Sequence, residues 1–341
     1  MSEPVALTLK PKDFKSDQEV RWCPGCGDYA ILAAMQSFLP SLGLEREKIA
    51  FVSGIGCSSR FPYYLNTYGM HSIHGRAPAI ATGLATTRPD LSVWVVTGDG
   101  DALSIGGNHL IHALRRNVNF KILLFNNRIY GLTKGQYSPT SEVGKITKST
   151  PAGSVDAPFN PLSLALGAEA SFVARTLDSD RKHLQQVLTT AAQHEGSAFV
   201  EIYQNCPIFN DDAFEVLKNP DSRDETLIRL THGEPITFGP EGKYAVVRNG
   251  WGIKVAETAS VPPSDIVVHD ETVTDPSYAF ALSRLSGENL DHTPIGVLRN
   301  VKRDTYDASV RRQVEAAKPV DTTPEQELTK LLTGGDTWTI L

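Results

Sequence analysis

The sequence contains little cysteine, has no surplus of positive charge and lacks a long apolar segment. Only four cysteines occur among 341 residues. That is too few for a disulfide-rich secreted scaffold but enough for one site with four thiolate ligands. Lysine and arginine number 33 against 39 aspartates and glutamates, so the chain lacks the basic surplus typical of nucleic-acid-binding proteins. Together these features indicate a globular protein whose four cysteines are available for one thiolate site.

No segment of the sequence is predicted to cross a membrane. The longest uncharged stretch, residues 29–44, contains Gln36 and Ser37 and is shorter and more polar than the ~20 apolar residues that span a bilayer. Near the N-terminus, Lys10 and Lys12 stand where a signal peptide would have its apolar core. We therefore expect a cytoplasmic protein whose cysteines are free to act as thiolate ligands.

Short apolar runs alternate with helical patterns in the first part of the chain. The runs at 91–96 and 121–125 are almost continuously apolar, which is typical of strands buried on both faces of a parallel sheet. The alternation predicts an α/β fold, an open and mostly parallel sheet with helices on both faces. We expect strands at residues 49–53, 91–97, 120–125, 170–174 and 198–203, and helices at residues 28–38, 77–87, 106–116, 161–166 and 180–194.

The pattern weakens after Cys206. We predict one domain over residues 1–210 and a C-terminal extension over residues 211–341 that wraps the core or a partner. Within this extension we expect a hairpin at residues 235–249, with its turn at 239–242, and two helices, at 275–285 and 306–317. No group of residues in it indicates catalysis.

Polar and glycine-rich clusters follow four of the predicted strands. Gly54 to Cys57 follows the first, Gly98 to Gly100 the second, Asn126 and Asn127 the third, and Cys206 the last. Ligands of open α/β sheets bind at the carboxyl ends of the strands. We therefore expect these clusters to meet at the edge where this fold builds its sites.

The four cysteines have the spacing of a metal centre. Cys23 and Cys26 form a C-x2-C pair, and Cys57 and Cys206 stand alone, the last followed by Pro207. Thiolates suit zinc or iron–sulfur clusters, and a proline often follows a cluster ligand. Spacing alone leaves three alternatives open: an iron–sulfur cluster, a structural zinc, or a redox-active C-x2-C with two unrelated cysteines.

A second constellation suits magnesium and phosphate. Asp99 and Asn127 follow neighbouring predicted strands, and carboxylate and amide oxygens are ligands that Mg²⁺ prefers. Glycines at 98 and 100 allow backbone amides to approach a diphosphate. The alternative is a tight turn with a capping aspartate.

Six segments together resemble the β subunits of the 2-oxoacid:ferredoxin oxidoreductases, most of all their 2-oxoglutarate (KorB-type) branch. They follow one another in colinear order over about residues 15–215. The segments are residues 22–27, 54–58, 74–77, 98–101, 126–133 and 135–140. The resemblance implies a thiamine diphosphate-binding fold with Mg²⁺ and one 4Fe-4S cluster.

The resemblance also implies a role for individual residues. The cluster ligands would be Cys23, Cys26, Cys57 and Cys206. The magnesium ligands would be Asp99, Asn127 and the backbone carbonyl of Ile129. The residues at the ring end of the cofactor would be Ile55, Gly56, Cys57, Ser58 and His74, and those at its diphosphate end Gly100, Asp101, Gly131 and Leu132.

Three of the candidate residues have an alternative role. His74 either binds the cofactor, pairs with His71 in a loop or caps the helix that starts at Ala77. Lys134, where one common family pattern has glycine, either meets a substrate carboxylate or a coenzyme A phosphate, or is simply exposed. Arg76 either approaches the substrate or braces its loop.

The implied reaction is a thiamine-dependent oxidative decarboxylation of a 2-oxoacid with coenzyme A. For 2-oxoglutarate the products are succinyl-CoA and CO₂, and electrons pass through the cluster to ferredoxin. We nominate no catalytic residue in this chain, because the family resemblance places the activating acid on an α subunit, the expected partner. The alternatives are pyruvate or another 2-oxoacid as substrate, a stand-alone thiamine enzyme, for which 341 residues show no second βαβ series, and a zinc-stabilised binding module without activity.

Overall fold

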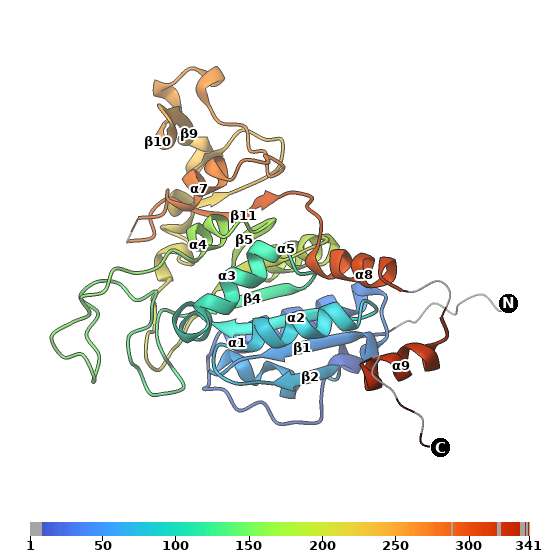
Figure 1. The fold of residues 1–341 in the computed structure, drawn as a ribbon. Helices are drawn as coiled ribbons and strands as arrows, with labels where there is room; N and C mark the ends of the chain where they lie inside the picture. Colours follow the sequence, from blue (N-terminus) through green and yellow to red (C-terminus); the bar gives the residue numbers. More distant parts are fainter. Residues whose placement is uncertain (1–8, 288, 319–321, 335–337, 339, 341) are drawn as a thin grey trace.

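The main sheet has eight strands in the order β2-β1-β3-β4-β6-β5-β11-β7 (Figure 1). The computed structural model describes residues 9–287, 289–318, 322–334, 338 and 340. All neighbouring strands of this sheet are parallel except β5 and β11, which are antiparallel. The strands are β1 (Ile49–Ser53), β2 (Tyr68–His71), β3 (Ser92–Gly98), β4 (Lys121–Asn126), β5 (Phe172–Leu177), β6 (Ala198–Tyr203), β7 (Leu227–Arg229) and β11 (Thr293–Asn300). The predicted open, mostly parallel sheet is confirmed.

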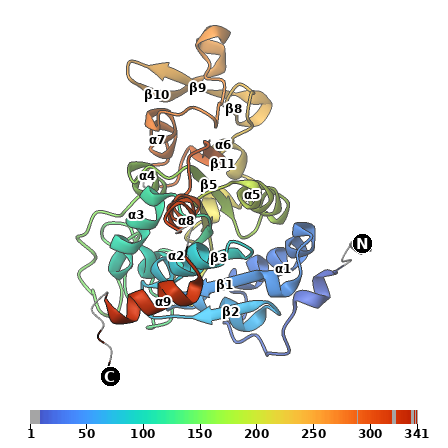
Figure 2. The same ribbon diagram turned by 45° about the vertical axis from the view of Figure 1, so that its right-hand side comes forward.

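Helices cover both faces of the sheet, as predicted (Figure 2). Successive side chains of a strand point to opposite faces, so Phe51 belongs to the apolar core on one face and Val52 to the core on the other. The first core is closed by α1 (Asp28–Phe38) and α5 (Arg181–Gln193), and the second by α2 (Ala77–Thr87), α3 (Gly107–Arg116) and α4 (Pro161–Gly167). A further helix, α8 (Tyr306–Ala316), packs on α2.

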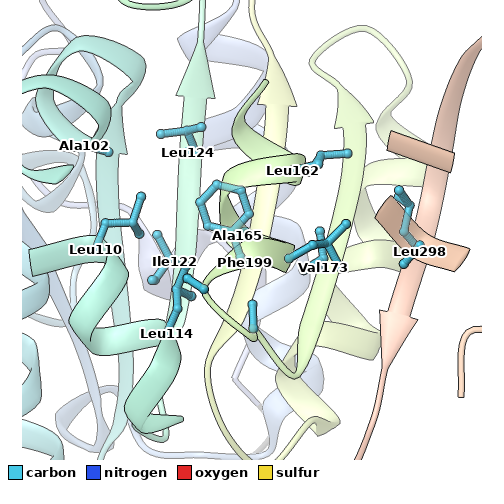
Figure 3. Packing of buried hydrophobic residues seen from close by; sticks show 14 of the residues in the cluster. Ala102, Leu110, Leu114, Ile122, Leu124, Leu162, Ala165, Val173, Phe199 and Leu298 are labelled. Carbon is cyan, nitrogen blue, oxygen red and sulfur yellow. The ribbon is translucent and has the colours of Figure 1, made fainter. Parts of the chain in front are cut away.

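In the second core, side chains one helical turn apart on α3 pack against side chains two residues apart on β4. Leu110 and Leu114 lie one helical turn apart on α3, and Ile122 and Leu124 lie two residues apart on β4 (Figure 3). All four side chains are fully buried in the same cluster. Burying each such side chain contributes about 2 kcal/mol, and together they fix α3 over the strand whose end carries Asn126 and Asn127.

The predicted strand and helix positions agree closely with the structure in the first part of the chain. Strands 49–53 and 198–203 coincide with β1 and β6, and helices 28–38 and 77–87 coincide with α1 and α2. The edge strand β2 was not predicted. Its four residues are all exposed, so it carries none of the apolar signal that marks the central strands.

The C-terminal part contributes to the main sheet and also forms a smaller one. Strands β8 (Thr237–Phe238), β9 (Tyr244–Asn249) and β10 (Gly252–Glu257) make an antiparallel sheet that projects at the top of Figure 1. The predicted hairpin corresponds to β8 and β9, whereas the pairing of β9 with β10 was missed. The remaining helices are α6 (Arg223–Thr226), α7 (Ser277–Ser283) and α9 (Pro324–Thr333).

The division into residues 1–210 and 211–341 stays a prediction. Strands β7 and β11 of the second part lie in the sheet of the first part. Among the described residues, no helix is both long and apolar enough to cross a bilayer.

Candidate functional site

A cavity lies at the carboxyl ends of β1, β3 and β4. Its wall includes every residue predicted to bind the cofactor or magnesium, whereas Lys134 and Arg76 are not part of it. The lining residues are Ile55, Gly56, Cys57, Ser58, His74, Gly98, Asp99, Gly100, Asp101, Phe125, Asn127, Ile129, Tyr130, Gly131, Leu132, Thr133 and Gln204. The strand-end clusters therefore meet in space as their positions in the sequence suggest.

Asp99 and Asp101 are both buried carboxylates of this cavity, and Asp99 is the one predicted to bind magnesium. Its Oδ2 accepts hydrogen bonds from Ser138 Oγ at 2.5 Å and Thr140 Oγ1 at 2.6 Å. Burial raises the pKa of Asp99 to about 6, and the two hydroxyl donors act against this rise. Ser138 and Thr140 were not predicted as site residues, although they lie in the segment 135–140 that carried part of the resemblance.

Asn127 and Ile129 line the same cavity as Asp99. Asn127 Oδ1 accepts a hydrogen bond from Ile129 N at 3.2 Å, which turns the chain directly after β4. Arg128, between them, has a left-handed backbone (φ 56°), and its N–H donates to Asn126 Oδ1 at 3.1 Å. A carboxylate, an amide and a backbone carbonyl are the hard donors that fit Mg²⁺.

Both carboxylate oxygens of Asp101 accept hydrogen bonds from neighbouring groups of the protein. Its Oδ1 accepts hydrogen bonds from Ile55 N at 3.1 Å, Gly75 N at 2.7 Å and the His74 ring nitrogen Nδ1, and its Oδ2 accepts one from Thr97 Oγ1 at 2.6 Å. This carboxylate therefore joins two loops of the cavity wall and fixes the His74 ring.

Gly100 allows a close approach that no other residue would permit. A Cβ atom at this position would lie 2.1 Å from Cε1 of Tyr130, and the Tyr130 hydroxyl donates to the Gly100 carbonyl at 3.1 Å. The backbone of Gly100 is ordinary (φ −66°), so the requirement comes from this contact alone. Tyr130 thus packs directly on the loop that carries Asp99.

The thiols of the four cysteines gather beside the cavity. A Cβ at Gly131 would lie 3.5 Å from Cys57 Sγ and 3.7 Å from Cys206 Sγ, so both thiols reach the same point of the cavity wall. Burial raises the pKa of the Cys57 thiol to about 12, reinforced by the charge of Asp28 and by Cys206 and Cys23. All four cysteines are free, with Cys23 exposed and Cys206 buried.

The loop that carries the C-x2-C pair is held against Cys57. The Cys26 N–H donates to the Cys23 carbonyl at 3.1 Å, and Gly25 between them has a left-handed backbone (φ 81°). The Trp22 indole donates to the Cys57 carbonyl at 2.7 Å. In the described part of the chain, no three histidine, cysteine or acidic side chains are close enough to hold a single metal ion.

Asp28 is an acidic residue near the thiols that sequence reasoning missed. It occupies the first position of α1, two residues after Cys26, and is 1% exposed. Burial raises its pKa to about 7, with the Cys26 thiol acting against the rise and Asp178 adding to it. Nothing in its sequence context indicates this burial, because an acid in the first helical turn is normally solvated.

The alternatives for His74, Arg76 and Lys134 can now be compared with the geometry. His74 contacts Asp101, and His71 instead lies 3.0 Å from Ser53 Oγ, so the two histidines have separate partners. Arg76 Nη1 donates to the Ile105 carbonyl at 3.1 Å, the bracing arrangement. Lys134 is exposed, with φ 73°.

Comparisons with known proteins agree with the site. The family described as the thiamine pyrophosphate enzyme, C-terminal TPP binding domain, matches residues 54–202. The 2-oxoglutarate oxidoreductase subunit KorB of Mycobacterium tuberculosis is 68% identical over 331 residues, which are 97% of this chain and 88% of that protein. A 2-oxoacid:ferredoxin oxidoreductase β subunit of a Sulfolobus species is 38% identical over 281 residues, 80% of this chain and 88% of that protein.

A solved structure agrees as well. The 2-oxoglutarate:ferredoxin oxidoreductase of Magnetococcus marinus, solved with 2-oxoglutarate, coenzyme A and succinyl-CoA bound, superposes with a TM-score of 0.75 at 35% identity, covering 95% of this chain and 96% of that one. The chain therefore belongs to the β subunits of the 2-oxoacid:ferredoxin oxidoreductases, enzymes with a thiamine diphosphate-binding domain. Within that family it belongs to the KorB-type, 2-oxoglutarate branch, and the predicted family and fold are confirmed.

Proposed function

We propose that this chain carries the thiamine diphosphate and the 4Fe-4S cluster of an enzyme that converts 2-oxoglutarate and coenzyme A to succinyl-CoA and CO₂. One observation carries the proposal: the Asp99–Asn127 cavity and the cysteine thiols share a wall at Cys57 and Gly131. Support for 2-oxoglutarate as the substrate comes from the Mycobacterium relative and from the ligands of the Magnetococcus structure.

Asp99, Asn127 and the Ile129 carbonyl would hold Mg²⁺ and, through it, the diphosphate of the cofactor. Ser138 and Thr140 hold the Asp99 carboxylate in place, so the metal would meet a ligand that is already oriented. The bound cofactor supplies the electron sink that decarboxylation of a 2-oxoacid requires.

The remaining residues of the cavity would orient the two ends of the cofactor. Gly100, Asp101, Gly131 and Leu132 would lie at its diphosphate end, with Asp101 contributing only its backbone because its carboxylate is engaged. Ile55, Gly56, Ser58 and His74 would lie at its ring end. Nothing in the cavity wall is assigned as the activating acid, which we expect from the α subunit.

Cys23, Cys26, Cys57 and Cys206 would each bind one iron atom of the cluster. A tetrathiolate zinc site would require all four sulfur atoms at about 2.3 Å from one ion, whereas a cluster distributes them over separate irons. Cys57 belongs to both sites, so the electron path between them would be short.

The proposed partners are an α subunit, which supplies the rest of the active site, and ferredoxin as electron acceptor. Cys23 is exposed, so the cluster would lie near the surface where an acceptor protein can approach. Four free cysteines also suit the reducing cytoplasm, where we place the enzyme.

The test is purification of the chain with its α subunit under anaerobic conditions. Iron and acid-labile sulfide are measured first, and stoichiometric zinc without iron would contradict the cluster. A coenzyme A-dependent assay with an artificial one-electron acceptor then compares 2-oxoglutarate, pyruvate and branched 2-oxoacids. We expect the highest kcat/KM with 2-oxoglutarate, and a higher value with pyruvate would assign the chain to the alternative substrate.

A further inference from the structure

A second cavity, of about 410 Å³, lies next to the proposed cofactor site and is lined by three arginines. Arg128 comes from the turn after β4, Arg175 from β5 and Arg284 from the residue that follows α7. None of these three arginines was singled out by the sequence. We call this space the arginine cavity.

The two cavities share one stretch of backbone. Asn126 and Arg128 line the arginine cavity, whereas Asn127 and Ile129 line the proposed cofactor cavity. Successive residues of this stretch therefore line different cavities, and Arg128 within it has a left-handed backbone (φ 56°). Such a conformation costs about 1 kcal/mol in a residue other than glycine, so the surrounding contacts must hold it in place.

Buried hydrogen bonds form the wall between the cavities. Thr140 Oγ1 lies 2.6 Å from Asp99 Oδ2 and 2.9 Å from Asn126 Oδ1. Asn126 Nδ2 then donates to Glu201 Oε1 at 2.8 Å, and Glu201 Oε2 accepts from Arg175 Nε at 2.7 Å. These polar contacts lead from the proposed magnesium ligand Asp99 to the buried Arg175.

The described lining of the arginine cavity has a surplus of positive charge. Three arginines face two acids, Glu142 and Glu201. Glu201 already binds Arg175, and Glu142 also pairs with Lys145 at 3.0 Å. Arg128 is held by stacking on the Phe214 ring, 5.4 Å from its centroid. The guanidinium groups of Arg128 and Arg284 therefore supply positive charge in a partly enclosed polar space.

We propose that the arginine cavity binds a small anion bearing a carboxylate or a phosphate, with Arg128 and Arg284 as its charged hydrogen-bond donors. Guanidinium groups present paired N–H donors whose geometry matches both anions. Partial enclosure strengthens the attraction relative to that at an open surface. The inference stands on the lining residues and does not rest on the proposed function, because it requires neither magnesium nor thiamine diphosphate.

The test measures binding of inorganic phosphate to the full-length chain, in its complex, by isothermal titration calorimetry without magnesium or thiamine diphosphate. The variants R284Q and R128Q each remove one donor, and we expect each to weaken phosphate binding by at least about tenfold. The control R312Q makes the same change of charge on α8, at an exposed arginine that pairs with Asp304, and should leave binding unchanged.

Competition then identifies the natural source of the anion. Displacement of phosphate by 2-oxoglutarate indicates a carboxylate occupant, and displacement by coenzyme A indicates a phosphate occupant; both support the proposal. Three results overturn it: no saturable binding, binding that neither R284Q nor R128Q weakens, or equal weakening by R312Q, which would indicate general surface attraction. A failure of the proposed function would appear instead in the iron analysis and substrate assay of the unmodified complex, which do not use these variants.

Discussion

Three buried aspartates of the site region differ mainly in the partners that surround them. Asp99 faces the cavity and is held by two hydroxyl groups, Asp101 accepts hydrogen bonds from two loops, and Asp28 lies beside the thiols. The sequence identified Asp99 through its spacing from Asn127. It could not identify Ser138 and Thr140 as supports, because a hydroxyl's partner depends on tertiary contacts and not on local pattern.

Replacing Asp99 tests the magnesium assignment. D99N removes the charged ligand while keeping its shape, and we expect thiamine diphosphate affinity to fall by more than about 100-fold, since even supporting residues of metal sites are worth 10- to 100-fold. Calorimetry measures the loss, and the visible absorbance of the cluster should be unchanged. D90N, an exposed aspartate before the opposite end of β3, is the control; cofactor binding retained in D99N would contradict the assignment.

Replacing Cys206 should have the reverse effect. C206S removes one of the four proposed iron ligands, and we expect loss of the cluster absorbance and of acid-labile sulfide. Thiamine diphosphate binding, measured on the same sample, should remain, because Cys206 is not one of the proposed magnesium ligands. Full iron content in C206S would show that this cysteine is not a ligand.

At the scale of the element, the strand ends were predictable and their loops were not. Central strands such as β4 are buried along their whole length, and an almost continuous apolar run in the sequence predicts that burial. The loops depend on close approaches between distant residues. The approach of Gly100 to Tyr130 is one example, and nothing in either local sequence indicates it.

The variant G100A tests that approach. Its Cβ would meet the Tyr130 ring, so we expect a loss of stability of about 1–3 kcal/mol from overpacking, together with weaker thiamine diphosphate binding. Thermal denaturation and calorimetry measure the two effects. In the double variant G100A/Y130L a smaller side chain relieves the contact and should restore part of the stability.

A matched glycine provides the control. Gly107, at the start of α3, has open space where its Cβ would be, so G107A should be neutral or slightly stabilising. Equal losses in G100A and G107A would mean that the Tyr130 contact is not the cause.

At the scale of the whole molecule, the C-terminal part is joined to the sheet. β11 pairs with β5, and the Asn117 side chain donates to the carbonyls of Arg303 and Asp304 at 3.1 and 3.3 Å. Sequence reading treated residues 211–341 as an extension, because a strand that pairs with a distant partner carries no local sign of that partner.

We therefore expect a fragment of residues 1–210 to fail to fold alone. Without β11, the edge of β5 would be left open, and the partners of Asn117 would be missing. Circular dichroism and thermal denaturation of the fragment should show no cooperative transition, whereas the full chain should unfold in one. A fragment with a sharp transition of its own would support two independent domains.

The same junction predicts a pH dependence of stability. His194 lies between Ser171 Oγ at 2.7 Å and Asn300 Oδ1 at 2.9 Å, and burial lowers its pKa from 6.5 to about 4. Between pH 6.5 and 4 this histidine binds a proton more readily in the unfolded chain than in the folded one, so its contribution to stability is lost as the pH is lowered through this range, whereas the raised pKa values of Asp28 and Asp99 act in the opposite direction. The loss due to His194 amounts to at most about 3 kcal/mol.

Urea denaturation at a series of pH values measures this effect. H194Q should lose less stability between pH 6.5 and 4 than the unmodified protein does, although His183, whose pKa burial also lowers to about 4, still contributes to the pH dependence of both. H232Q, at an exposed position, should show the full decline. An unchanged slope in H194Q would contradict the assignment.

The antiparallel pairing of β11 with β5 also bears on how the chain folds as it is synthesised. β5 and its neighbour β6 leave the ribosome close together, but residues 293–300 emerge only after most of the chain has been made. At typical rates of translation the interval is on the order of ten seconds. During that interval one edge of β5 has no strand to pair with, and an unpaired edge attracts other chains. The nascent protein therefore passes through a stage in which binding by a chaperone would protect it.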